Sequence, residues 1–139
     1  MYARLQKRLI ERSEMLCNGQ FDELAAHYHF PFVAYHDGVP TVVMSHAQAA
    51  DSLRKISALM DSRGVVELNV EVNSVELPRN GRYRVWSRYT EIGRCGKKIS
   101  QSDVIQYLVE SSRGVHVEMI ESFGCPLAEI WAPREALLE

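Results

Sequence analysis

Three histidines within ten residues are the side chains in this 139-residue chain that could bind a metal: His27, His29 and His36. A zinc site needs three or four ligands at fixed distances, and no pattern of nearby cysteine, aspartate or glutamate completes a familiar set. We therefore interpret the histidines as half-buried polar residues and predict no metal site.

A second group with possible chemistry is a series of three arginines, Arg82, Arg84 and Arg88, on one face of a predicted strand. Such a stripe could attract an anion, but Glu67 and Glu71 can pair with it across a hairpin. We expect a solvated strand face. The sequence contains no serine nucleophile elbow, Walker loop or dinucleotide fingerprint, so no cofactor is expected.

The overall composition limits the classes of partner. The net charge of −2 gives no reason to expect nucleic acid as a partner. The first twelve residues are too charged for a membrane span or a signal peptide, so no membrane partner is expected. Cys17, Cys95 and Cys125 form no CxxC pair, which is typical of reduced thiols in a cytoplasmic protein. The length fits one domain over 1–139, with a C-terminal tail from about 125.

Three helices must position any site in this chain. Leu5 and Leu9 recur at helical spacing in the first, and Asn18-Gly19 ends it. The third begins at Ser45, with Gln48 three residues later in the spacing of a capping box. The predicted helices are 2–17, 21–28 and the segment between Ser45 and Gly64.

The remainder of the chain is predicted to be strand. A hairpin turns at Asp37-Gly38, and four strands joined by short turns follow the third helix. The order ααββαββββ predicts an α+β domain in which three N-terminal helices pack in the concave face of a strongly curved, mainly antiparallel sheet. Such a cone leaves an open mouth and an apolar cavity where a small ligand can bind.

Three segments carry a recognisable pattern: NGQFDELAAHYHFPFVAYHDG, the capped helix SHAQAADSLRKI and the closing hairpin SDVIQYLVESSRGVHVEMIESF. In this organisation the chain resembles the nuclear-transport-factor-2-like superfamily, which includes ketosteroid isomerases, polyketide cyclases of the SnoaL type and scytalone dehydratase. The resemblance covers Leu5 to Phe123 and is specific to the fold rather than to an activity.

The isomerase branch of the superfamily gives a residue-by-residue test. Its chemistry needs a carboxylate base, and a tyrosine and a protonated aspartate that donate hydrogen bonds to the oxyanion. With the hairpin turns aligned, the resemblance places Tyr35 at the base, Gln106 at the oxyanion acid and Arg12 at the tyrosine. All three chemical types differ, so ketosteroid isomerase activity is not expected.

Strand alternation predicts which side chains of the last two strands face the cone. Asp103 should face out, and Glu121 should face in, where partial desolvation would raise its pKa and suit it to general acid or base work. The alternative is a Glu121 that lies solvated at the rim or pairs with an arginine such as Arg12. The residues expected to face the cone are Ser102, Val104, Gln106, Leu108, Val117, Met119, Glu121 and Phe123. The expected ligand contacts are Arg12, Tyr35, Gln106, Met119 and Glu121.

The opposite face of the sheet is unusually apolar for a surface. Ile105, Tyr107 and Ile120 should lie there, together with Trp86, and no helix remains to cover them. We predict a homodimer packed sheet to sheet. The alternative is that the tail containing Trp131 folds over this face.

The sequence supports two hypotheses about function. The first is a cone that binds a small, largely apolar molecule, with cofactor-free isomerase, cyclase or dehydratase chemistry as a further step. The second is a homodimeric interaction or scaffold module whose cone is filled by its own side chains.

Overall fold

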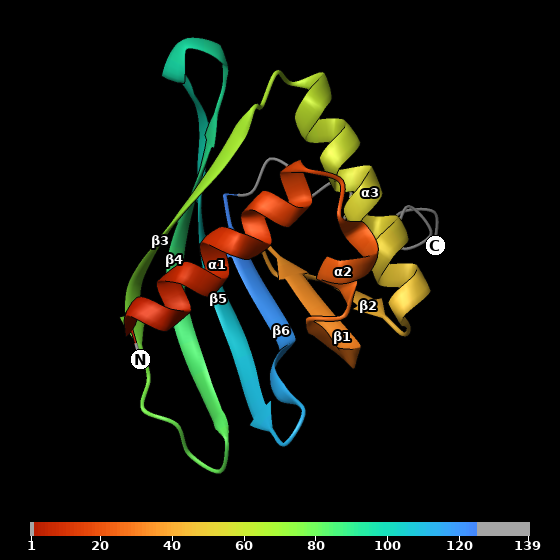
Figure 1. Ribbon diagram of the computed structural model, residues 1–139, viewed down its shortest axis with the longest axis vertical. Coiled ribbons are helices and arrows are strands. Elements are labelled where there is room, and N and C mark those ends of the chain that lie inside the picture. The colour runs from red at the N-terminus through yellow and green to blue at the C-terminus, as the bar shows by residue number, and fades with distance from the viewer. Residues whose placement is uncertain (1, 125–139) are drawn as a thin grey trace.

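The computed structural model describes residues 2–124, and its element order confirms the predicted ααββαββββ arrangement (Figure 1). The helices are α1 (Tyr2–Cys17), α2 (Phe21–Ala25) and α3 (His46–Ser62), with a short 3-10 turn at Arg94–Gly96. The strands are β1 (Tyr28–His36), β2 (Val39–Val43), β3 (Glu67–Val75), β4 (Arg82–Ile92), β5 (Lys98–Ser111) and β6 (Gly114–Phe123). No helix within residues 2–124 is long and apolar enough to cross a membrane. The alternative that involves Trp131 lies outside the described residues.

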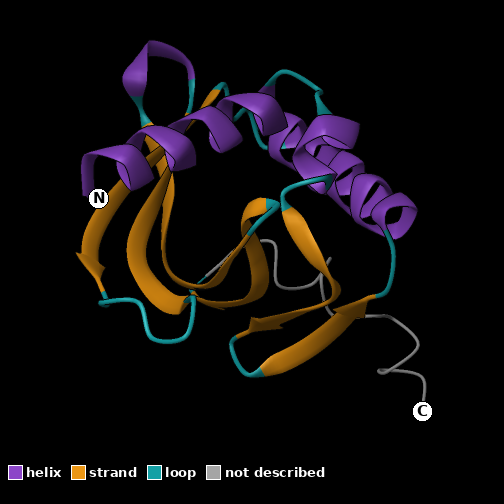
Figure 2. Ribbon diagram, turned by 60° about the horizontal axis from the view of Figure 1, so that its bottom comes forward, coloured by secondary structure: helices purple, strands orange, loops and turns teal. Residues whose placement is uncertain are grey.

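The six strands form one mixed sheet in the order β2-β1-β6-β5-β4-β3. Neighbouring strands are antiparallel except β1 and β6, which run parallel. The sheet curls strongly, and the helices lie across its concave side (Figure 2). Helix α1 packs against β3, and α2 packs against α3. The predicted cone is therefore confirmed.

Helix α1 both fills the core and covers the edge of the sheet. Leu5 and Leu9 are buried in the core. The side chain of Gln6 donates to the carbonyl of Val70 at 2.8 Å and accepts from the amide of Val72 at 2.8 Å. Strand β3 is an edge strand and has no neighbouring strand on this side. The carboxamide of Gln6 therefore satisfies the backbone carbonyl of Val70 and the backbone amide of Val72.

Helix α3 begins with the predicted cap. The hydroxyl of Ser45 accepts a hydrogen bond from the amide of Gln48 at 3.3 Å. The carboxamide of Gln48 reaches back to the amide of Met44 at 2.8 Å, one residue earlier than in the usual capping box. The cap fixes the start of the helix, and Leu53 and Ile56 on its inner face are buried.

The prediction of a second helix over 21–28 is wrong at its C-terminal end. Helix α2 stops at Ala25, because the following residues are drawn into the sheet. Tyr28 pairs with Val117 of β6, and the carbonyl of His27 accepts from the amide of Val117 at 2.9 Å.

A β-bulge in β6 changes which of its side chains face inward. Tyr107 of β5 lies opposite Met119, but the next residue, Leu108, lies opposite Val117. Glu118 is therefore an extra residue on β6, and alternation beyond it is reversed.

The turn between β3 and β4 requires glycine. Asn80 and Gly81 both have positive φ, 53° and 75°. A Cβ on Gly81 would lie 2.8 Å from the carbonyl oxygen of Glu110, so only glycine lets the turn approach β5 this closely.

Candidate functional site

A cavity of about 150 Å³ lies inside the cone, and we call it the central cavity. Its apolar wall comes from the three helices and from strands β3, β5 and β6. The apolar side chains are Leu16, Leu24, Leu53, Ile56, Met60, Leu68, Val104 and Ile120. Its main polar side chains are Arg12, His36, Tyr89, Ser102, Gln106 and Ser122. An apolar enclosure with a few polar groups is typical of a small-molecule site.

Arg12, Gln106 and Tyr89 form the polar centre of the cavity. Arg12 is only 7% exposed, and its Nη1 donates to Oε1 of Gln106 at 3.5 Å, a long hydrogen bond. The same carboxamide donates through Nε2 to the hydroxyl oxygen of Tyr89 at 3.0 Å. Gln106 thus orients both neighbours.

The hydroxyl of Tyr89 is a hydrogen-bond donor available to a ligand. Burial raises the pKa of Tyr89 above its usual value, although Arg12 lowers it somewhat. The group is therefore protonated at neutral pH, and within residues 2–124 its proton has no acceptor. Tyr89 and Arg12 together place two donors beside one apolar space.

His36 and Ser122 form a second polar pair in the wall. Nδ1 of His36 hydrogen bonds the hydroxyl of Ser122, and both residues are buried. Burial lowers the pKa of His36 to about 4, against a weaker opposing effect of Asp37. The imidazole is therefore neutral at pH 7.

An ion pair at another part of the wall joins α3 to the sheet. Nη1 of Arg63 donates to Oε1 of Glu91 at 2.9 Å, and Nη2 donates to Oε2. The hydroxyl of Ser100 donates to the same carboxylate. Glu91 is buried, so its charge depends on these partners. Sequence reasoning missed this pair, because its members lie on different elements and 28 residues apart.

The expectation that Glu121 and Met119 face the cone is wrong. Both lie beyond the bulge at Glu118, so both point to the outer face of the sheet. Glu121 accepts a hydrogen bond from the hydroxyl of Tyr107 there. Ile120, expected on the outer face, lines the central cavity instead. Phe123, also expected inside, is 46% exposed.

Tyr35 is likewise placed outside the cavity. It pairs with Glu121 across the parallel β1–β6 ladder, so its side chain shares the outer face with that carboxylate. Its neighbour His36 points inward in its place. Of the five expected ligand contacts, Arg12 and Gln106 lie together in the wall of the central cavity. Tyr35, Met119 and Glu121 do not line this cavity.

The histidines and arginines considered in the sequence form neither a metal site nor an anion site among the described residues. His29 is exposed and His27 is half-buried. The described residues contain no group of three or more potential metal ligands. The three arginines of β4 pair with acids other than the two expected: Arg82 with Glu118, Arg84 with Glu76 and Arg88 with Asp103. Asp103 faces outward, as predicted.

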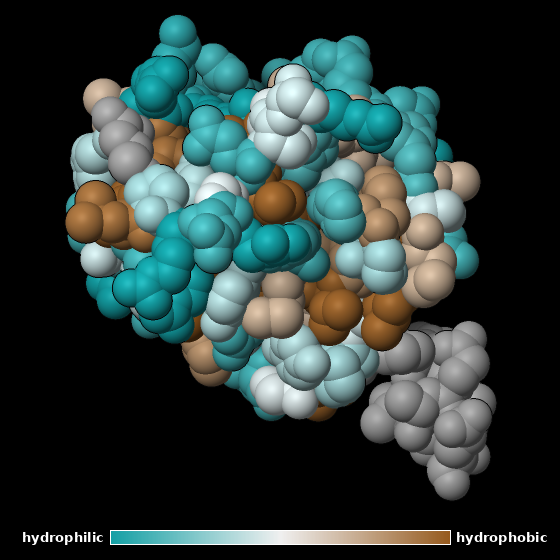
Figure 3. Space-filling view, turned by 90° about the horizontal axis from the view of Figure 1, so that it is seen from below, coloured by the Kyte–Doolittle hydropathy of each residue, from teal (hydrophilic) through white to brown (hydrophobic). Residues whose placement is uncertain are grey.

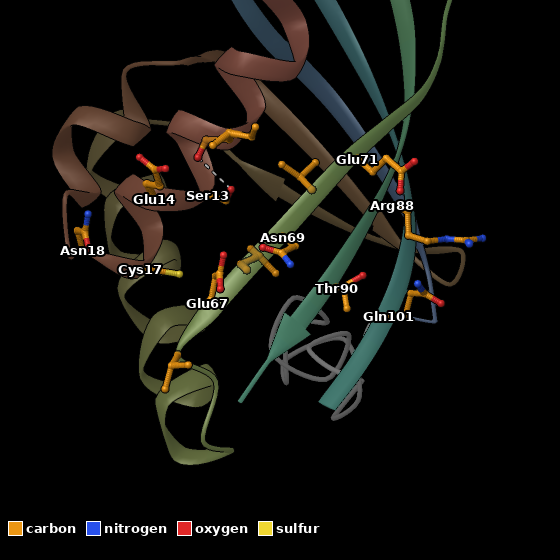
Figure 4. Close-up of a pocket in the computed structure, with 14 residues that line it drawn as sticks. Ser13, Glu14, Cys17, Asn18, Glu67, Asn69, Glu71, Arg88, Thr90 and Gln101 are labelled. Carbon is orange, nitrogen blue, oxygen red and sulfur yellow. Dashed lines mark hydrogen bonds between the residues drawn. The ribbon is translucent and has the colours of Figure 1, made fainter. Parts of the chain in front are cut away.

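A larger hollow of about 680 Å³ lies at the edge of the sheet, between α1 and β3 (Figure 4). Glu14, Cys17 and Glu67 face this groove, and Arg88 and Gln101 lie on the far side of β3. All five side chains are exposed to solvent. We take the central cavity as the candidate site, because its polar groups are buried and converge on one space.

Comparison of the chain with protein-family models finds no match, and comparison with curated proteins finds none. Solved structures do match. A domain of unknown function with a cystatin-like fold from Nostoc punctiforme has a TM-score of 0.70 at 13% identity, over 98% of this chain and 82% of that one. A ketosteroid isomerase-like protein from Erwinia carotovora atroseptica has a TM-score of 0.62 at 15% identity, over 88% of this chain and 94% of that one.

A third similar structure is an NTF2-like protein with a cystatin-like fold from Novosphingobium aromaticivorans. It has a TM-score of 0.63 at 11% identity, over 97% of this chain and 86% of that one. Likeness at such low identity shows a shared fold and assigns no activity. The chain therefore has the cystatin-like cone fold of the nuclear-transport-factor-2-like proteins.

Proposed function

We propose that this protein binds a small, largely apolar molecule in the central cavity. The observation that carries the proposal is the convergence of Arg12, Gln106 and Tyr89 on a mainly apolar cavity of about 150 Å³. A cavity of about this volume can hold benzene, so the expected ligand is a small one.

Binding is better supported than a reaction. Cofactor-free isomerase, cyclase or dehydratase chemistry needs a group in the wall that removes a proton. Among the described residues of the wall, Glu91 is the one carboxylate, and it is held by Arg63 and Ser100. Catalysis stays a prediction that rests on the resemblance to the isomerase-like structures.

Filling the cavity should abolish binding. In the variant Ser102→Phe, a large ring replaces a small side chain of the wall, so phenol and toluene should no longer bind. Ligand-observed NMR measures the binding of both probes. Ser112→Phe places the same ring in the exposed β5–β6 turn and should bind them like the wild type. Equal signals from all three proteins, or none from the wild type, would contradict the proposal.

A second candidate function is that of a homodimeric interaction module, and the outer sheet face favours it. The half-buried side chains of Trp86, Ile105 and Tyr107 lie side by side on this face. Among residues 2–124, all three helices lie on the other side of the sheet. By contrast, the surface seen from below in Figure 3 is mainly hydrophilic, and its hydrophobic residues lie at several separate places. A second copy of the chain is the proposed partner.

A charge at the centre of this face should dissociate the dimer. We expect sedimentation of the wild type to give twice the mass of one chain, and Ile105→Asp to give the mass of one chain, because the interface would bury an unpaired carboxylate. Ile10→Asp introduces the same charge at an exposed isoleucine of α1 and should leave the dimer intact. A wild-type mass of one chain at every concentration would rule out this assembly.

A further inference from the structure

Arg12 is a buried cation whose charge is poorly satisfied. Its Nε is fully buried without a hydrogen-bond partner, and its one hydrogen bond to the described part of the chain is the 3.5 Å contact with Gln106. Its guanidinium also lies 5.3 Å from the centre of the Tyr28 ring. No carboxylate among residues 2–124 forms an ion pair with it. A buried charge in this state is costly, so the fold retains Arg12 at the expense of stability.

A second arginine, Arg8, adds positive charge close to Arg12. Arg8 lies one helical turn earlier, and its Nη2 donates to the carbonyl of Val115 at 2.6 Å. Burial lowers the pKa of His27 to about 4, and the charges of Arg12 and Arg8 contribute to this shift. The local field therefore favours an anion.

We infer that the ligand of the central cavity carries a carboxylate, which pairs with the guanidinium of Arg12 and accepts a hydrogen bond from the hydroxyl of Tyr89. This inference rests on the proposed binding function and names its ligand class. A planar carboxylate matches the fork of N–H donors on a guanidinium. Gln106 hydrogen bonds both donors, and Leu53, Ile56 and Ile120 supply apolar wall for the rest of the ligand.

The cavity volume limits the ligand to a short acid. About 150 Å³ suits a molecule of about six or seven non-hydrogen atoms, the size of benzene or slightly larger. A branched aliphatic acid such as isovalerate meets this limit. Its amide, isovaleramide, has the same shape without the charge, so the pair isolates the contribution of the carboxylate.

The test compares the affinities of isovalerate and isovaleramide by calorimetry at pH 7. We expect the wild type to bind the acid at least about tenfold more tightly than the amide, because the hydrogen bonds to Arg12 become charge-assisted. In Arg12→Met the two affinities should become equal. Arg4→Met removes an exposed positive charge from the same helix but not the proposed donor, so it should retain the preference.

A measurement without ligand separates this role from a structural one. Because Arg12→Met removes an unpaired buried charge, we expect its urea midpoint to lie above that of the wild type. An arginine that mainly stabilises the fold would instead give a lower midpoint on replacement. A lower midpoint together with an unchanged preference for the acid would overturn the assignment to Arg12.

The outcomes also distinguish this inference from the proposed function. If phenol and isovaleramide bind but isovalerate binds no more tightly than its amide, the carboxylate inference fails and the binding function stands. If none of the three probes binds to the wild type, both fail. The wild-type ratio tests the preference for a carboxylate even if Arg12→Met does not fold.

Discussion

Replacing Arg63 with methionine is expected to lower the free energy of unfolding by about 3 kcal/mol, as expected when a buried carboxylate loses its partner. The side chain of Glu91 is only 6% exposed, and that of Arg63 is 28% exposed. Without Arg63, the carboxylate keeps only the hydroxyl of Ser100. Urea unfolding at pH 7 measures the loss.

The exposed ion pair between Arg88 and Asp103 is the matched control. Its N–O distance is 2.9 Å, but the two side chains are 47% and 59% exposed, so Arg88→Met should change stability little. The double variant Arg63→Met/Glu91→Met should recover most of the free energy of unfolding that Arg63→Met loses, because it leaves no unpaired carboxylate. If Arg63→Met and Arg88→Met had equal effects, the buried pair would not hold α3 to the sheet.

Acidification is expected to destabilise the protein through two histidines, His27 and His36. The fold lowers both pKa values from 6.5 to about 4, mainly by burial. Between these values the unfolded chain binds more protons than the folded one, so stability is full above about pH 6.5 and is lost as the pH falls toward 4. At pH 5 the loss is at most about 2 kcal/mol per histidine, from 1.5 pH units at about 1.36 kcal/mol each.

Urea unfolding at pH 7.5, 6.5, 5.5 and 5.0 measures this loss, in a range where most carboxylates stay ionised. The double variant His27→Gln/His36→Asn should show a much flatter profile. His29→Gln changes an exposed ring and should keep the wild-type slope. An equally steep profile in the double variant would show that other groups cause the acid sensitivity.

The features that the sequence predicted correctly depend on local chemistry. The spacing of Leu5 and Leu9, the cap at Ser45 and the turn at Asp37-Gly38 are each encoded within a few residues. The order of the elements then left few ways to bury the apolar faces, so the cone followed.

The wrong assignments arise where pairing with distant strands decides the outcome. Met119 and Ile120 are both apolar, so β6 alone does not show which of them faces the core. The extra residue, Glu118, becomes visible only in the pairing with β5. Tyr35 and His36 are equally ambiguous, because either ring suits a cavity wall. The pair of Glu91 and Arg63 joins a strand to the end of a helix, a contact that spacing along the chain does not predict.

The bulge at Glu118 decides which side chains of β6 form the inner surface of the cone. If Glu118 instead paired with Tyr107 without a bulge, simple alternation from Val117 would place Glu121 in the cavity and Ile120 on the outer face. The strand would keep its neighbours while an acid entered the wall that Ile120 now lines. A one-residue change of register, rather than a series of substitutions, could thus exchange a wall suited to a negatively charged ligand for one that repels it.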